Sequence, residues 1–157
     1  MPPWVLDVGL VCTTTVVLVV YQELLERTVL LEELIKAPGK ETSNFLYGTV
    51  VPSVLEEFLF RLLPLGSTLL LTSNWYTIIS VVLVTSLLFG LLHDVSLRAK
   101  VLLMVPGSTV LSGVFVYVAY RADNVLVGYA ASVLVHFSLN FMEDLRWWWF
   151  NSFWKRG

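Results

Sequence analysis

The chain has 157 residues, of which 57% are apolar and only 14% are charged. Soluble globular domains average roughly 45 to 50% apolar and about 25% charged residues, so this composition points to a membrane protein. The formal net charge of -2 gives no overall attraction to nucleic acid or to acidic substrates. The single cysteine, Cys12, excludes an intrachain disulfide and a cysteine-rich metal site. We therefore expect one membrane domain over residues 1–157. Its expected partners include membrane lipid but no nucleic acid.

Five apolar runs are long enough to cross about 30 Å of hydrocarbon as helices. They cover residues 4–21, 45–71, 75–93, 99–120 and 124–142. Residues 22–41 interleave charged side chains with leucines, which predicts an amphipathic helix outside the hydrocarbon. Residues 143–157 combine tryptophans with basic residues, a composition typical of a helix in the headgroup region. The prediction is an all-α polytopic transmembrane bundle of about five spans, with a motif-bearing core at about residues 45–142 and two flanking interfacial segments.

The distribution of basic residues predicts the orientation of these spans. Eight Lys and Arg residues lie in the links and tail on one side, whereas the other side has only Arg121. By the positive-inside rule, the N-terminus is expected outside and the C-terminal tail in the cytoplasm. The third and fifth spans then run toward the cytoplasm, which places His93 and His136 near that side.

Three charged side chains lie within six residues of the second span: Glu56, Glu57 and Arg61. A charge at the bilayer centre costs about 2.5 to 3.5 kcal/mol on insertion scales, so these residues need partners, water or a function. Glu57 and Arg61 have i, i+4 spacing with the acid first, which favours an ion pair. Glu56 points about 100° away from Glu57 around the helix, so it is expected to face the other spans.

Further polar groups are found where Glu56 could meet them. His93 ends the third span, and His136 and Asn140 share one face of the fifth span because they have i, i+4 spacing. A carboxylate beside an imidazole can hold a water molecule and remove its proton. His136 and Asn140 can donate hydrogen bonds to an oxygen on which negative charge develops. This set of residue types predicts hydrolysis of a peptide bond by an activated water.

The three motifs in these spans resemble those of the CPBP family of intramembrane proteases: Glu56-Glu57-x-x-x-Arg61, Phe89-x-x-x-His93 and His136-x-x-x-Asn140. That family includes type II CAAX prenyl proteases and bacteriocin-processing, Abi-like proteins, and the resemblance covers Val51 to Phe141. It implies an intramembrane endopeptidase of EC class 3.4, with its site open to the cytoplasm. The implied substrate is a peptide or a prenylated or membrane-anchored protein.

Carried onto this chain, the resemblance implies that Glu56 and His93 activate the water, while His136 and Asn140 stabilise the oxyanion. Three further motif residues are expected to support the site: Glu57, Arg61 and Phe89. The family's mechanism has been interpreted both as metal-dependent and as glutamate-dependent.

Two alternatives remain open. A glutamate and two histidines could instead bind zinc through Glu56, His93 and His136. The chain has no His-Glu-x-x-His helix, so we expect no cofactor. The protein could also be a non-catalytic membrane scaffold or binding protein that retains the polar core. A transporter has less support, because the five spans contain no visible repeat.

Overall fold

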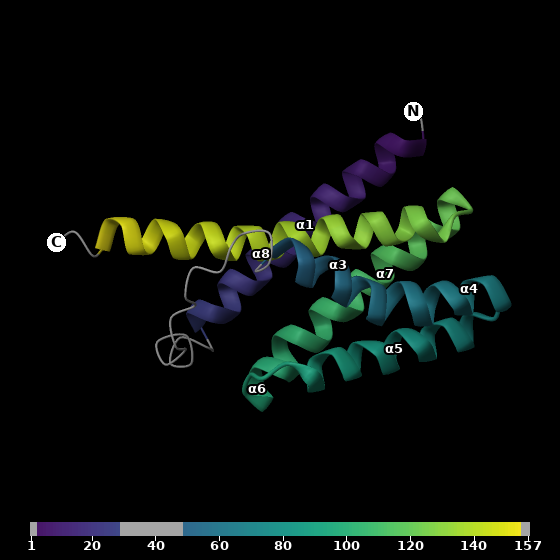
Figure 1. Ribbon diagram of the computed structural model, residues 1–157, viewed down its shortest axis with the longest axis horizontal. Coiled ribbons are helices and arrows are strands. Elements are labelled where there is room, and N and C mark those ends of the chain that lie inside the picture. Colours follow the sequence, from purple (N-terminus) through teal and green to yellow (C-terminus); the bar gives the residue numbers. More distant parts are fainter. Residues whose placement is uncertain (1–2, 29–48, 155–157) are drawn as a thin grey trace.

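All regular structure in the described part of the chain is helical, as predicted. The computed structural model describes the backbone of residues 3–28 and 49–154 and the side chains of residues 8–25 and 49–145. The elements are α1 (Pro3–Thr28), α3 (Val51–Glu57), η2 (Phe58–Gly66), α4 (Ser67–Leu71), α5 (Trp75–Leu92), α6 (Leu97–Ala99), η3 (Lys100–Met104), α7 (Val105–Ala122) and α8 (Val125–Trp154) (Figure 1). Within these residues, four helical stretches are long and apolar enough to cross a membrane: Val8–Leu25, Trp75–Leu92, Leu97–Ala122 and Val125–Leu145.

The predicted second span is not one regular α-helix. It consists of α3, the π-helix η2 and α4, which follow one another with right-handed helical backbone at each junction. Pro64 lies inside η2. Proline has no backbone N–H and its ring collides with the carbonyl of the preceding turn, and a wider helical turn relieves both problems. The charged residues therefore lie on a segment that is helical throughout but changes its winding at Phe58.

The two predicted interfacial segments continue neighbouring helices. Helix α1 extends to Thr28 and so includes the beginning of the segment predicted at 22–41, whose remainder lies outside the described residues. Helix α8 runs for 30 residues to Trp154, so no turn marks the predicted junction at residue 143.

Helix α7 is the centre of the bundle and packs against α5, α8 and α1. Figure 1 shows α7 running obliquely from the end of α5 to the start of α8, and the second span also contacts α8 directly. Two groups of buried apolar side chains fill these contacts. The first joins α1, α7 and α8 and contains Leu18, Leu111, Val114, Val118, Ala131 and Val135. The second joins η2, α5 and α7 and contains Leu65, Ile78, Phe115 and Val116.

The closest approach of α7 and α8 requires Gly128. A Cβ atom at this position would lie 2.5 Å from the carbonyl oxygen of Phe115 and 2.6 Å from Cβ of Ala119. Small residues permit such close packing between membrane helices, where dispersion contacts drive association.

We expect Gly128→Ala to destabilise the bundle by about 1 to 3 kcal/mol, because the new methyl group overlaps backbone atoms that cannot move aside. Gly113→Ala on α7 is the matched control, since a Cβ there meets nothing within 4 Å. Thermal unfolding in detergent would measure both variants. Equal midpoints for the two would contradict the close approach.

Candidate active site

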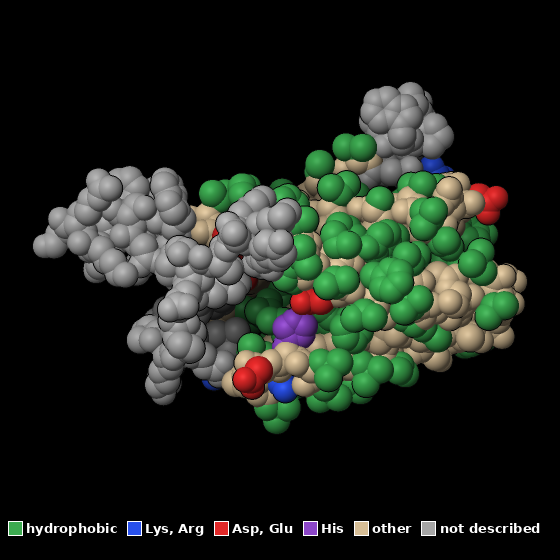
Figure 2. Space-filling model, in the orientation of Figure 1, with side chains coloured by type: hydrophobic (Ala, Val, Ile, Leu, Met, Phe, Trp, Pro, Cys, Tyr) green, Lys and Arg blue, Asp and Glu red, His purple; other side chains and the backbone are tan. Residues whose placement is uncertain are grey.

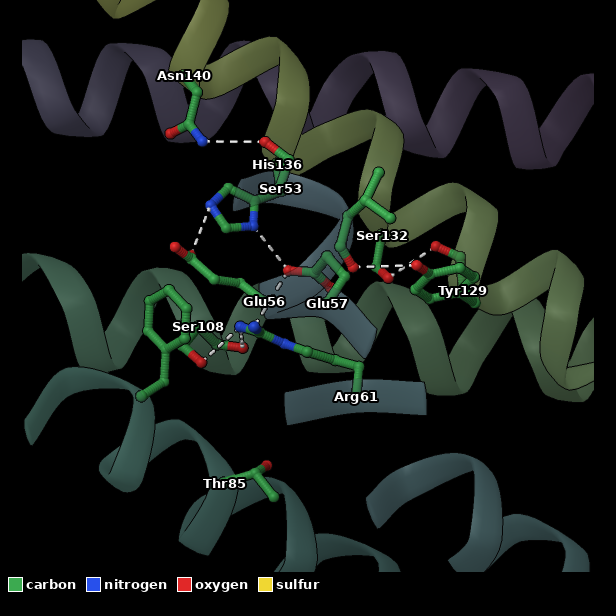
Figure 3. A network of polar contacts seen from close by, with 12 residues as sticks. Ser53, Glu56, Glu57, Arg61, Thr85, Ser108, Tyr129, Ser132, His136 and Asn140 are labelled. Carbon is green, nitrogen blue, oxygen red and sulfur yellow. Dashed lines mark hydrogen bonds and ion pairs between the residues drawn. The ribbon is translucent and has the colours of Figure 1, made fainter. Parts of the chain in front are cut away.

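Two rows of polar side chains face each other across the contact between the second span and α8. Thr49, Ser53, Glu57 and Arg61 follow at intervals of four residues, and all four are completely buried. On α8 the interval of four residues recurs with Ser132, His136, Asn140 and Asp144. Because the two segments are antiparallel, three pairs form between them, and the first is Thr49 with Asp144. The other two are Ser53 with Asn140 and Glu57 with His136 (Figure 3). We call these two facing rows the polar seam, and the candidate site lies at the end of it where Glu57 meets His136.

The predicted ion pair between Glu57 and Arg61 is present, with Arg61 Nη1 3.1 Å from Glu57 Oε1. Arg61 Nη2 also donates to Ser108 Oγ at 2.6 Å on α7. Its guanidinium lies 4.7 Å from the centre of the Phe89 ring on α5. A buried cation needs such partners because it has lost its water. Arg61 therefore links η2, α5 and α7 beneath the site.

His136 contacts both glutamates, which corrects the predicted division of their partners. Its Nδ1 lies 2.9 Å from Glu57 Oε1, and its Nε2 lies 3.5 Å from Glu56 Oε2. The two carboxylates do diverge around the helix, but the imidazole lies between them and offers each a different nitrogen (Figure 3). Glu57 is consequently shared between Arg61 and His136, whereas the sequence assigned it mainly to Arg61.

His93 approaches Glu56 from the end of α5. Its Nε2 lies 3.9 Å from Glu56 Oε2, and both side chains are 29% exposed. Its Nδ1 lies 2.7 Å from the carbonyl oxygen of Phe89. Because a carbonyl only accepts hydrogen bonds, Nδ1 carries the proton and a neutral His93 presents an unprotonated Nε2 to Glu56. The backbone of α5 thus sets the tautomer of this histidine.

The Phe89 ring holds the two histidines in place. Its centroid lies 4.3 Å from that of His93 and 6.0 Å from that of His136. The Phe60 ring makes a T-shaped contact with it, with the two ring centroids 5.3 Å apart. Phe89 itself is buried. One ring therefore lies against Arg61 and both imidazoles, and the supporting role of Phe89 stays a prediction.

Asn140 lies one turn along α8 from His136, as predicted, but its amide is engaged by another residue. Asn140 Nδ2 donates to Ser53 Oγ at 3.0 Å. The structure thus brings Glu56, His93 and His136 together. Asn140 lies one turn beyond His136 on α8, in the seam (Figure 3). The role of Asn140 in catalysis stays a prediction.

The site is reached from the surface through Glu56 and His93, since the other acid and the arginine are buried. Figure 2 shows an acidic side chain and a histidine touching on a face that is otherwise largely apolar. Exposed apolar side chains on the same helices include Leu55, Leu59, Leu91 and Leu92. An apolar rim around a polar centre suits a substrate that approaches from the membrane.

Within the described residues, no group of three or more His, Cys, Asp or Glu side chains has a metal-binding arrangement. Any metal held by Glu56, His93 and His136 would use the two Nε2 atoms, because Nδ1 of each histidine has a hydrogen-bond partner. The absence of a cofactor stays a prediction, and zinc binding by these three residues stays the alternative for experiment.

Sequence reasoning missed Thr49, Ser53, Ser108, Ser132 and Asp144. The usable signal was the interval of four residues that relates Thr49 and Ser53 to Glu57, repeated by Asp144 relative to Asn140 and His136. Single serines and threonines are common in membrane helices, where they often bond to the carbonyl of their own preceding turn, so each by itself carried little information.

A protein-family model described as type II CAAX prenyl endopeptidase Rce1-like matches residues 38–142. The matched range includes all the polar residues of the three motifs: Glu56, Glu57, Arg61, His93, His136 and Asn140. No curated protein and no solved structure gave a significant match to the chain.

Proposed function

Because the chain belongs to the type II CAAX prenyl endopeptidase Rce1-like family, we propose that it hydrolyses a peptide bond in the membrane with a water activated by Glu56 and His93. The family indicates a protease, and the four apolar helices identify an integral membrane protein. The observation that carries the proposed mechanism is the placement of Glu56 Oε2, which faces Nε2 of both His93 and His136.

In this mechanism, a water molecule binds between Glu56 and His93. Glu56 removes one proton, and the oxygen attacks the scissile carbonyl carbon while His93 Nε2 accepts the hydrogen bond of the remaining O–H. A positioned general base of this kind typically raises a reaction rate by about 10² to 10⁴-fold. The tetrahedral intermediate then breaks its C–N bond, and the proton on Glu56 passes to the leaving amine nitrogen.

The oxyanion of that intermediate is stabilised by His136 and Asn140. An ionised Glu57 can only accept, so His136 Nδ1 donates to it, and Nε2 carries a proton only when the ring is an imidazolium. Donation to the oxyanion therefore requires the doubly protonated ring, which donates to Glu57 through Nδ1 and to the substrate oxygen through Nε2. Glu57 and Arg61 therefore support catalysis through His136 and do not contact the substrate.

The proposed substrate is a prenylated protein segment that ends in a CAAX sequence, as the family description implies. The exposed apolar side chains around Glu56 and His93 fit a substrate held by a lipid group. Following the distribution of basic residues, the site opens to the cytoplasm and the N-terminus lies outside.

Purified protein in liposomes, incubated with a farnesylated peptide ending in a CAAX sequence, is expected to release a C-terminal fragment detectable by mass spectrometry. The same peptide without the farnesyl group measures how much the lipid contributes. A chelator such as 1,10-phenanthroline is expected to leave the rate unchanged, since the mechanism uses no metal. Loss of activity that zinc restores would favour metal binding by Glu56, His93 and His136 instead.

A non-catalytic scaffold is the second candidate, favoured by one observation. The seam residues Ser53, Glu57 and Arg61 are completely buried and bonded to other helices, as a structural core would require. This function predicts that no lipidated peptide is cleaved and that Glu56→Gln leaves the protein's behaviour unchanged.

A further inference from the structure

Ser53 has a defined hydrogen-bond direction. It lies one turn before Glu57 and is completely buried. Its hydroxyl donates to the carbonyl oxygen of Thr49 at 2.7 Å and lies 3.0 Å from Asn140 Nδ2. A hydroxyl has one proton and a carbonyl only accepts, so Ser53 Oγ must act as the acceptor toward Asn140. Asn140 therefore has to present its NH₂ group, and not its oxygen, to α3.

We propose that Ser53 is a positioning residue that orients the Asn140 amide so that its second N–H can donate to the oxyanion. This inference rests on the hydrolysis proposed above. An amide nitrogen has two N–H groups, and Ser53 accepts one of them. Without that acceptor the amide could rotate by half a turn and present its oxygen, which would repel the developing negative charge.

The neighbouring contacts hold α3 against α8 without help from Ser53. The Thr49 hydroxyl bonds to Asp144 Oδ2 one turn before Ser53, and Tyr129 OH donates to the carbonyl oxygen of Val54 at 3.0 Å. Glu57 bonds to His136 one turn after Ser53. Removing the Ser53 hydroxyl should therefore disturb the Asn140 amide more than the helix packing.

The test measures kcat and KM for the farnesylated CAAX peptide with Ser53→Ala, Asn140→Ala and the double variant. Loss of one oxyanion donor costs about 10² to 10³-fold in kcat, which sets the expected size for Asn140→Ala. Ser53→Ala is expected to lower kcat by about 10 to 100-fold, a part of that loss, with KM within about twofold. In the Asn140→Ala background, Ser53→Ala should cause no further loss, because the two residues act as a unit.

Ser112→Ala is the matched control. Ser112 is also a completely buried serine in a membrane helix, but its Oγ has no hydrogen-bond partner within the described residues. This variant should retain wild-type kcat. Should Ser53→Ala not fold, Ser53→Cys replaces the hydroxyl by a weakly accepting thiol and should show the same fall in kcat.

An unchanged kcat for folded Ser53→Ala or Ser53→Cys would overturn the positioning role, as would an equal loss from Ser53→Ala with and without Asn140. If the wild type cleaves the peptide and Glu56→Gln does not, these results bear on Ser53 alone. If the wild type cleaves nothing, the proposed function fails and the positioning role fails with it.

Discussion

Glu56→Gln is expected to lower kcat for peptide hydrolysis by about 10² to 10⁴-fold, because the amide cannot take a proton from water. The Glu56 side chain is 29% exposed and its contacts are with two histidines, so the fold does not depend on its charge. The thermal unfolding midpoint should therefore stay close to that of the wild type. Initial rates with the farnesylated CAAX peptide and thermal unfolding of the same preparation would measure both effects.

Two further variants sharpen this experiment. Glu56→Asp keeps the carboxylate but withdraws it by about one methylene, and a displacement of about 1 Å can cost about 10²-fold in rate. Glu143→Gln removes a carboxylate that is exposed on α8 and should have no effect on kcat. Wild-type rates for Glu56→Gln would exclude Glu56 as the base and favour the scaffold function.

Arg61→Met is expected to destabilise the protein more than any other single change considered, by about 3 to 5 kcal/mol. Arg61 is completely buried and binds Glu57, Ser108 and the Phe89 ring. Its loss leaves the buried Glu57 carboxylate with His136 in place of two partners. For a chain of this size, the loss corresponds to a fall of roughly 6 to 20 °C in the unfolding midpoint. Thermal unfolding in a mild detergent would measure it.

A double-mutant cycle adds a second variant, Glu57→Gln, which removes the charge that Arg61 neutralises in the wild type. In the Arg61→Met background, Glu57→Gln should recover part of the lost stability, because a neutral amide replaces a buried carboxylate that has lost its arginine. Arg121→Met is the control, since Arg121 is exposed at the end of α7 and its loss should change little. Additive effects of the Arg61 and Glu57 changes would show that the ion pair has no energetic importance.

Much of the site could be predicted because it depends on local helix geometry. The spacing of Glu57 and Arg61 within one helix fixed their pairing, and the structure contains it. The divergence of Glu56 from Glu57 indicated that Glu56 would face the histidines, and it lies near Nε2 of both His93 and His136. The depth of each residue in its span follows from counting residues along a helix, which requires no tertiary information.

Other contacts could not be predicted because they depend on the rotation of one helix against another. The shared use of His136 by both glutamates requires the ring to lie between them, and the length of the spans does not determine that placement. The engagement of Asn140 by Ser53 depends in the same way on how α3 lies along α8. The π-helical winding of η2 around Pro64 is likewise a feature that counting residues along a regular α-helix does not give.

By itself, the sequence determined that this protein is a helical membrane protein with charges that need partners, because hydrocarbon tolerates neither unpaired backbone groups nor isolated ions. It also predicted that His93 and His136 lie near the same side of the membrane. Only the tertiary structure decided which atoms meet, through the antiparallel packing of the second span on α8. That packing lines up residues at intervals of four on both segments and places Ser53 against Asn140 and Glu57 against His136. Glu56 is left at the surface facing two imidazole nitrogens.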